Sequence, residues 1–397
     1  MHKTNSIDAP GSPSINNIGG MIPARSHICR GAALHFDRLI GEIAHRTAKR
    51  LRRGAPIRVK PLEEMVMKVE ARTEQWEMAE PFRISGETFT HAEIAVITIE
   101  DRGVVGRGEA CGVYYRDDTS ARIVEQVTEL APILAAGGIG RAELQHLLPT
   151  GGARNALDAA LWEIEAGHAG KPVWQLAGFA EIRSLPTVFT IGVASPGEMA
   201  RKSASMHYAR SIKLKLEGEG EDAERVKAVR AARPDAQIAV DGNRGFDPES
   251  LDAIMPTLRA AGVMLIEQPF ALGKDADLRY IDRTIPIAAD ESVQDGDDLE
   301  RLIGLVDFVN IKLDKCGGLT HALEMERTAR AMGFRVMVGN MTGTSWSQAP
   351  AFILGQRCDL CDLDGPTFLA RDRVPGVRYA DGMVHCPDDV WGRGQVR

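Results

Sequence analysis

Residues 308–332 read FVNIKLDKCGGLTHALEMERTARAM, a short strand-like run followed directly by a helix-compatible stretch. Phe308 to Leu313 is rich in apolar and β-branched residues, and Leu319 to Met332 has the pattern of a helix. A buried strand followed by a helix is the repeating unit of parallel α/β folds. A fold of this class requires further copies of the unit elsewhere in the chain.

The unit recurs throughout the second half of the chain. Short apolar runs alternate there with seven helix-compatible stretches, of which Glu219 to Arg233 is one. The eight expected strands are Thr187–Gly192, Ser211–Leu216, Gln237–Asn243, Met264–Pro269, Ile285–Glu291, Phe308–Leu313, Arg335–Asn340 and Leu360–Asp364. This alternation predicts a closed (β/α)7β barrel of the TIM type over residues 183–368.

The chain before the barrel has a different organisation. Strand-like runs at 65–71, 92–100 and 104–110 come first, and helical patterns at 119–136, 141–148 and 153–169 follow. Strands and helices in separate blocks indicate an α+β domain, which we expect over residues 63–182.

The first 62 residues differ from both parts. A tail rich in Ser, Asn, Gly and Pro precedes a basic amphipathic helical pattern at residues 34–53. A targeting segment is one interpretation, but Asp37 and Glu42 argue against it. We therefore expect a flexible extension outside the folded domains.

Composition excludes several classes of protein. The 48 Lys and Arg against 55 Asp and Glu give a net charge of −7, which disfavours nucleic acid as the main partner. No apolar run approaches the ~18 residues of a membrane helix. The six cysteines, sparse and without an evident secretory signal, indicate reduced thiols and a cytoplasmic protein. Cys358 and Cys361 have metal or redox spacing but no second pair, so we interpret them as buried thiols.

Ionisable residues mark the carboxyl ends of the expected strands, where a barrel has its mouth. Lys213 and Lys215 lie on the second strand, and from Lys215 to Lys312 one such residue follows every 22 to 26 residues, or one βα unit. The others are Asp241, Glu267, Asp290 and Lys312 on the third to sixth strands and Asp362 and Asp364 on the eighth. We expect these groups at nearly one height in the barrel mouth.

Asp241, Glu267 and Asp290 are the candidate metal ligands. Three carboxylates that converge in a confined site need a cation between them. Oxygen donors without His or Cys favour Mg²⁺. Asn243 and Glu291, close to these ligands in sequence, are expected to support them. The alternative is a set of surface loop acids.

Lys215 and Lys312 are the candidate proton-transfer residues, because they flank the acidic residues from either side. Partial burial and a neighbouring cation such as Lys213 would lower a lysine pKa toward the working pH. Two lysines on opposite sides of a substrate imply proton removal from one face and delivery to the other. Alternatively, both lysines only neutralise the acids as buried ion pairs.

Combined, these motifs resemble the enolase superfamily, muconate-lactonizing subgroup. The resemblance is carried by Ile212–Lys215, by Val309–Leu319 and by the acidic trio, which is Asp241, Glu267 and Asp290. Within that subgroup, Asp362-Leu363-Asp364 on the eighth strand and the helix Ala153–Trp162 are most similar to dipeptide epimerases. The resemblance covers the chain from about Met65 to its end.

The resemblance implies a fold, a cofactor and a reaction. A capping domain would be built from the N-terminal segment with a C-terminal segment, 369–397, returning to it. One Mg²⁺ per subunit would bind the carboxylate of a small dipeptide substrate and stabilise an enediolate while the two lysines exchange the α-proton of the C-terminal residue. Asp362 and Asp364 would bind the substrate's α-ammonium, with Lys213 beside them. The alternative for the aspartates is a turn that caps Gly365. Membrane partners are not expected, and self-association of the chain is left open.

Side-chain specificity departs from that of epimerases acting on L-Ala-D/L-Glu. Aligning Pro81–Ile84 with the similar family segment places Phe89 where those enzymes carry a basic residue. Arg83 or Arg116 would have to replace that charge, so we expect an apolar substrate side chain to be preferred over an acidic one.

Two other reactions of the same superfamily are alternatives. An N-acylamino-acid racemase or a muconate-type cycloisomerase would keep the lysines and the metal ligands. Neither would need Asp362 and Asp364, because its substrate lacks the free ammonium group.

Overall fold

The computed structural model describes residues 67–84 and 86–396. The chain divides into two compact units, Met1–Arg58 and Val59–Arg397, and all of the described residues belong to the second. The predicted extension and its helical pattern at 34–53 lie outside the described residues, so they stay a prediction.

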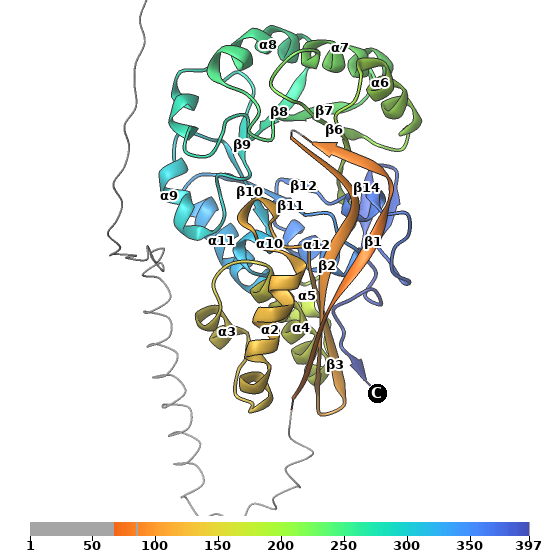
Figure 1. The fold of residues 1–397 in the computed structure, drawn as a ribbon, viewed down its shortest axis with the longest axis vertical. Coiled ribbons are helices and arrows are strands. Elements are labelled where there is room, and N and C mark those ends of the chain that lie inside the picture. Colours follow the sequence, from red (N-terminus) through yellow and green to blue (C-terminus); the bar gives the residue numbers. More distant parts are fainter. Residues whose placement is uncertain (1–66, 85, 397) are drawn as a thin grey trace, which may run out of the picture. The chain divides into compact units, whose positions relative to one another are not determined.

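Eight parallel strands form one sheet in sequence order (Figure 1). They are β5 (Val188–Ile191), β6 (Ser211–Lys215), β7 (Gln237–Asp241), β8 (Val263–Glu267), β9 (Ile287–Ala289), β10 (Phe308–Lys312), β11 (Arg335–Gly339) and β12 (Leu360–Asp362). The predicted TIM-like barrel is confirmed, with every expected strand in place.

Helices connect most of the strands. They are α6 (Pro196–Ser205), α7 (Asp222–Ala232), α8 (Pro248–Ala260), α9 (Leu299–Leu302), α10 (Leu313–Cys316), α11 (Leu319–Ala331) and α12 (Ser345–Gly355), with 3-10 turns η3 (Asp275–Arg279), η4 (Gly296–Asp298) and η5 (Gly365–Phe368).

The expected helix between β8 and β9 is wrong, because η3 alone occupies that connection. The only apolar residue that η3 buries is Leu278, so the segment has no apolar face for a full helix.

The barrel is closed between β5 and β12 by side chains. Among the described residues no strand ladder joins these two strands. Instead, the Leu363 amide donates to Thr187 Oγ1 at 2.9 Å, and the Thr190 amide donates to Asp364 Oδ2 at 2.6 Å. Asp364 thus contributes to the closure of the barrel.

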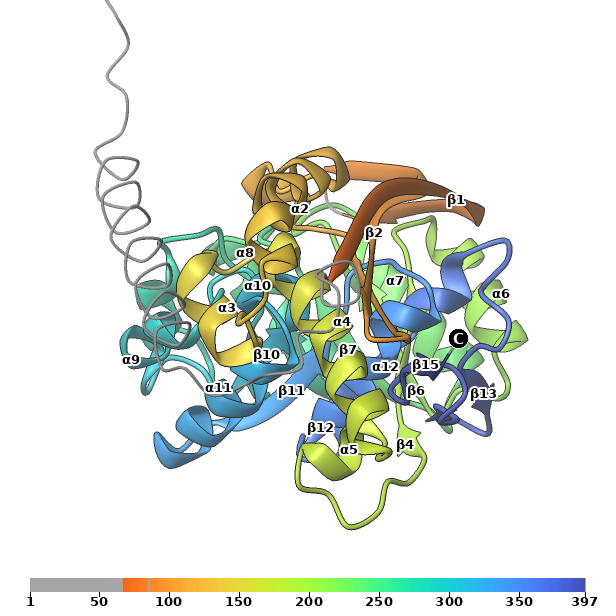
Figure 2. The same cartoon turned by 90° about the horizontal axis from the view of Figure 1, so that it is seen from below.

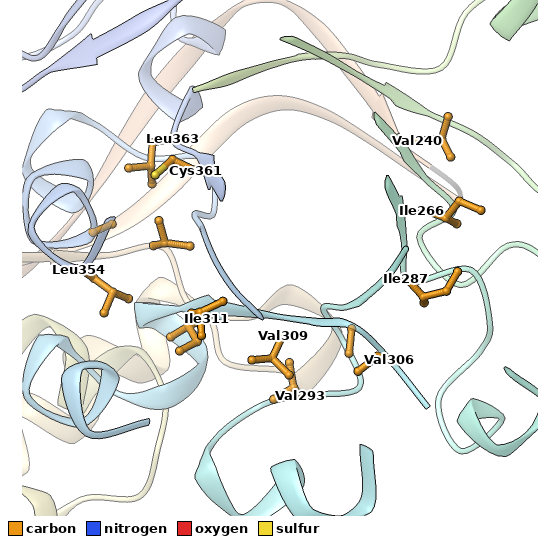
Figure 3. Packing of buried hydrophobic residues seen from close by; sticks show 14 of the residues in the cluster. Val240, Ile266, Ile287, Val293, Val306, Val309, Ile311, Leu354, Cys361 and Leu363 are labelled. Atoms are coloured by element: carbon orange, nitrogen blue, oxygen red, sulfur yellow. The ribbon is translucent and has the colours of Figure 1, made fainter. Parts of the chain in front are cut away.

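Alternate positions of the strands face opposite sides. Val240, Ile266 and Ile287 are fully buried and join Leu354 of α12 in the main apolar cluster, between strands and helices (Figure 3). The opposite positions fill the barrel interior with a smaller cluster, namely Ala239, Leu265, Ala288, Phe308 and Met337. At the barrel mouth, the last inward-facing positions of the strands are occupied by the ionisable residues.

The capping domain is an antiparallel sheet with helices against it (Figure 2). Its main elements are β1 (Lys68–Ile84), β2 (Glu87–Asp101), β3 (Val104–Ala110), η2 (Tyr114–Arg116), α2 (Ser120–Ala135), α3 (Arg141–Leu147), α4 (Gly152–Ala169) and α5 (Val173–Leu176). The sheet packs closely on α4, since a Cβ on Gly106 or Gly108 would lie about 2 Å from a carbonyl oxygen of that helix.

The expected first two strands, 65–71 and 92–100, are too short. β1 and β2 form one long hairpin that runs past a bulge between Glu77 and Phe82 to its turn near Gly86. Phe82 and Ile84 are buried and Arg83 between them is exposed. This alternation is that of a strand with one buried face.

The C-terminal segment returns to the cap. β15 (Gln395–Val396) pairs with β3, while β13 (Arg378–Ala380) and β14 (Met383–His385) form a small sheet with β4 (Leu185–Pro186). The fold class is therefore confirmed as a barrel with a cap built from both ends of the second unit. Between residues 67 and 396 no helix is long and apolar enough to cross a membrane.

Candidate active site

Strand register brings the candidate residues together at the barrel mouth. Lys215 pairs with Asp241 across β6 and β7, and Asp241 pairs with Glu267 across β7 and β8. On the other side of the barrel, Lys312 pairs with Gly339, which pairs with Asp362. The structure thus sets these residues into two rows that face the interior.

Lys213 and Lys215 bind the acidic residues directly. Lys215 Nζ lies 2.6 Å from Asp241 Oδ2, and Lys213 Nζ lies 3.1 Å from Glu267 Oε2 and 3.5 Å from Asp241 Oδ2. Lys213 also forms an ion pair with Asp362 Oδ2. All of these side chains are buried, so Lys213 links the eighth strand to the acidic trio.

Asp290 is shared by two lysines. Its Oδ2 lies 2.6 Å from Lys312 Nζ, and its Oδ1 lies 2.6 Å from Lys315 Nζ. Lys315 is 1% exposed and also donates to the backbone oxygens of Asp290 and Asn310, at 2.6 and 3.0 Å. All three protons of its ammonium group are therefore used, whereas Lys312 has one described acidic partner.

Charge and burial shift several pKa values. Burial, with the charges of Asp241 and Asp290, raises the pKa of Glu267 to about 7 against the opposing effect of Lys213. Lys312 and Lys315 outweigh burial and hold the pKa of Asp290 far below its usual range. The expected lowering of a lysine pKa is wrong for Lys312, because Asp290 and Glu267 outweigh burial and raise it.

The donor set fits a hard divalent cation. Asp241, Glu267 and Asp290 come from adjacent strands, are buried and offer oxygen atoms alone. Among residues 67–84 and 86–396, no three His, Cys, Asp or Glu side chains are grouped as a finished metal site, and ammonium groups bind the carboxylates. Burial first, and then the charges of Asp241 and Asp290, disfavour the ionised form of Glu267, and a bound cation would offset both effects.

Asn243 and Glu291 lie beside this group. The backbone N–H of Asn243 donates to Asp241 Oδ1 at 2.9 Å, and Arg244 Nε lies 3.2 Å from Glu291 Oε1. Asn243 Oδ1 and Glu291 Oε2 are buried without a hydrogen-bond partner. Both are acceptors, so they suit a donor such as a water molecule.

Asp362 and Asp364 have different surroundings. Asp362 Oδ2 pairs with Lys213, and its Oδ1 is buried without a partner. Asp364 binds Thr190 across the barrel closure, and burial raises its pKa to about 7. Asp364 is the N-cap residue of η5, but its side chain makes no capping hydrogen bond there.

A cavity of about 490 Å³ lies between the cap and the barrel mouth. Lys215 and Lys312 both line it, together with Asp290, Asn243 and Glu291 from the barrel. The cap contributes apolar and aromatic side chains, among them Met78, Phe82, Ile84, Phe89, Tyr114 and Tyr115, and a similar number of polar ones, among them Gln75, Thr88, His91 and Glu93. Phe89 packs edge-on against Tyr114, with ring centroids 5.6 Å apart.

The two arginines considered for specificity lie away from the cavity. Arg83 points to the other side of the hairpin, where Nη2 donates to Glu217 Oε1 at 2.9 Å. It lines a separate groove along α6. Arg116 Nη1 donates to Gln294 Oε1 at 3.0 Å and is not part of the cavity lining.

Two residues of the site, Asn310 and Lys315, were not predicted from the sequence. Asn310 Nδ2 donates to Glu267 Oε1 at 2.7 Å, and the amide itself is fully buried. Asn310 could have been found, because it has the parity of Lys312 on the same strand. Lys315 has no such signal, since its direction depends on the short helix α10.

Comparison with known families adds to this geometry. Residues 66–178 match the N-terminal domain of mandelate racemase and muconate lactonizing enzymes, and residues 197–394 match the enolase C-terminal domain-like family. The chain belongs to the enolase superfamily. It is thus an enzyme, an isomerase of the mandelate racemase and muconate lactonizing type.

Several relatives have assigned activities. The L-Ala-D/L-Glu epimerase of Escherichia coli is 37% identical over 315 residues, which are 79% of this chain and 97% of the relative. An N-acetyl-D-glutamate racemase from Pseudoalteromonas is 34% identical over 75% of this chain and 94% of its own. A hydrophobic dipeptide epimerase from Roseobacter litoralis is 32% identical, over 83% and 99% respectively.

Solved structures of superfamily members are similar over most of the described chain. An Agrobacterium tumefaciens protein with homology to dipeptide epimerases, with bound sodium and L-Ala-L-Glu, has a TM-score of 0.80 and 38% identity over 82% of this chain and all of its own. The dipeptide epimerase of Cytophaga hutchinsonii, complexed with Mg and D-Ala-L-Val, has a TM-score of 0.76 and 26% identity over 83% and 95%.

Proposed function

We propose that this protein is a Mg²⁺-dependent dipeptide epimerase that inverts the α-carbon of the C-terminal residue. The observation that carries the proposal is that Lys215 and Lys312, on β6 and β10, line one cavity from either side of the acidic strands β7 to β9. Both relatives and solved structures named as dipeptide epimerases support the substrate class.

The two lysines would act as opposed bases. A neutral amine on one side takes the α-proton, and the ammonium group on the other side gives a proton to the opposite face. Because the charges of Asp290 and Glu267 raise the pKa of Lys312, its neutral form requires that a cation offset the charge of these carboxylates. Each lysine is tethered to a carboxylate, Lys215 to Asp241 and Lys312 to Asp290, which restricts its position. Lys213 cannot share this role, because its buried ammonium is engaged by Glu267 and Asp362.

Asp241, Glu267 and Asp290 would hold one Mg²⁺. When bound, the ion supplies charge stabilisation for the substrate carboxylate as the α-proton leaves. Glu267 is oriented for this role by Asn310, and Asp290 is oriented by Lys315.

The unpartnered Oδ1 of Asp362 would accept the dipeptide's α-ammonium group. We expect Asp362→Asn to raise the KM for dipeptides by about tenfold or more, because a charge-assisted hydrogen bond is lost. Steady-state kinetics with L-Ala-L-Leu and with N-acetyl-L-Leu would measure the effect. An equal loss of kcat/KM for both substrates would contradict a role for Asp362 in binding the ammonium group.

An N-acylamino-acid racemase is the second candidate, since an N-acetyl-D-glutamate racemase is also similar to the chain. Measuring kcat/KM for L-Ala-L-Xaa dipeptides and for matched N-acetyl amino acids separates the two functions. Faster turnover of the N-acetyl compounds would favour the racemase.

The cavity favours an apolar side chain on the second residue of the dipeptide. Among the described residues that line it, the only Lys or Arg side chains are Lys215 and Lys312, both paired with acids. A substrate carboxylate buried against Phe89 would have no Lys or Arg partner among the described cap residues of the cavity and would lose affinity. The hydrophobic dipeptide epimerase among the relatives is consistent with this preference.

We therefore expect L-Ala-L-Leu to be epimerised faster than L-Ala-L-Glu. Phe89→Arg should shift the ratio of the two kcat/KM values toward Glu by about tenfold, because the guanidinium would pair with the carboxylate. Phe89→Leu is the matched control and should keep the preference for Leu. A clear advantage of L-Ala-L-Glu with the wild-type enzyme would overturn the preference.

A further inference from the structure

We infer that helix α4 of the cap positions Lys312, and that Arg154 is the positioning residue. The inference rests on the proposed two-lysine function. It states that different parts of the fold position the two proton-transfer residues. The segment after Lys312 is bound by the cap, whereas the loop after Lys215 is held mainly by the barrel.

Arg154 forms hydrogen bonds with the segment that begins directly after Lys312. This segment is α10, Leu313–Cys316, with the two glycines that follow it. Arg154 is 4% exposed and donates from Nη2 to the Cys316 oxygen at 2.5 Å and from Nε to the Gly317 oxygen at 3.2 Å. Both views of the fold place α10 beside α4 (Figures 1 and 2).

The next two turns of α4 form hydrogen bonds with Thr320. Asp158 and Trp162 follow Arg154 at intervals of four, which places them on one face of the helix. Asp158 Oδ2 accepts the Thr320 amide proton at 3.0 Å, and Trp162 Nε1 donates to Thr320 Oγ1 at 3.0 Å. The cap therefore binds this chain segment at residues 316, 317 and 320.

The two glycines after α10, Gly317 and Gly318, allow Arg154 to approach the backbone closely. Gly317 and Gly318 have φ of +84° and +110°, and a Cβ on Gly317 would lie 2.2 Å from Arg154 Nε. On the other side Asp314 Oδ1 accepts the amides of Cys111 and Gly112, at 2.9 and 3.1 Å. The turn that follows Lys312 is thus held by the cap through Asp314 as well as through Arg154.

The same segment also carries Lys315, which binds both the side chain and the backbone of Asp290. A shift of α10 would therefore move Lys312 at its root and its acidic partner together. A displacement of about 1 Å is enough to slow a positioned proton transfer about a hundredfold.

Lys215 has another kind of support. The loop after it is held within the barrel, where Asp222 Oδ2 accepts the amides of Glu217 and Gly218 at 3.0 and 2.8 Å. The cap reaches this loop through Arg83, an exposed side chain whose ion pair with Glu217 contributes little. Loss of Arg154 should therefore harm one lysine and spare the other.

The test compares α-proton exchange from the two epimers of one dipeptide in D₂O, followed by ¹H NMR with Mg²⁺ present. Lys312→Ala and Lys215→Ala first identify the epimer whose exchange depends on each lysine. Arg154→Met and Arg154→Lys are then compared with Arg107→Met. Arg107 is a matched control, because it is a buried arginine that pairs with Glu163 of the same helix and has no described contact with residues 313–320.

Arg154→Met is expected to slow exchange from the Lys312-dependent epimer about tenfold or more relative to the other epimer. Arg154→Lys should show a smaller asymmetry of the same sign, and it serves if the Met variant does not fold. Arg107→Met should show none. Equal slowing of both epimers in the Arg154 variants, or the same asymmetry in Arg107→Met, would overturn the inference. The two lysine variants test the proposed function independently of Arg154, because they should lose exchange from opposite epimers. If they do not, both the proposed function and the inference about Arg154 are wrong.

Discussion

Lys312→Ala and Lys215→Ala should each reduce epimerisation by about a thousandfold or more, because in each variant one face of the α-carbon lacks its acid or base. Each variant should still exchange the α-proton of one epimer, and the two variants should retain opposite epimers. Chiral chromatography measures the epimerisation, and ¹H NMR in D₂O measures the exchange.

Both variants should remain folded. Asp290 keeps Lys315 when Lys312 is removed, and Asp241 keeps Lys213 at 3.5 Å when Lys215 is removed. Neither change leaves a buried carboxylate without a cation, which is the costly outcome for a buried ion pair. Near-normal interconversion by either variant would show that the lysines serve only as counter-ions.

Removal of the metal should have an equally large effect. Chelation with EDTA is expected to abolish activity, and added Mg²⁺ should restore it. Glu267→Gln should weaken Mg²⁺ binding and lower kcat/KM by about a hundredfold or more, because one anionic ligand is lost. Isothermal titration calorimetry gives the Mg²⁺ affinity independently of turnover.

Glu163→Gln is the control for Glu267→Gln. Glu163 is also fully buried and paired with a cation, but it lies on α4 and binds Arg107. It should leave the affinity for Mg²⁺ unchanged even if the melting temperature falls. Full activity after exhaustive chelation would remove the metal from the mechanism.

The barrel could be predicted from sequence because its strands are buried on both faces. Runs such as Phe308 to Leu313 are apolar enough to be found without knowledge of their partners. The ends of parallel strands meet at one edge, so Asp241, Glu267 and Asp290 could also be predicted to lie close together. Register then follows from the alternation of inward and outward positions.

The cap and the ion pairs were harder to predict. The polar stretch from Arg72 to His91 carries no strong strand signal, yet it forms a hairpin because it packs over the barrel mouth. The outward direction of Arg83, away from the cavity, is a consequence of that strand, since its neighbours Phe82 and Ile84 face inward. The role of Lys315 depends on the direction that α10 takes after the barrel strand, which residue spacing does not encode.

The most direct test of the proposed function is ¹H NMR of a library of L-Ala-L-Xaa dipeptides in D₂O with the enzyme and Mg²⁺. A dipeptide epimerase with this cavity should remove the α-proton signal of the C-terminal residue and produce the L-Ala-D-Xaa epimer, fastest for apolar Xaa. No exchange in any dipeptide, together with exchange in N-acetyl amino acids, would contradict it.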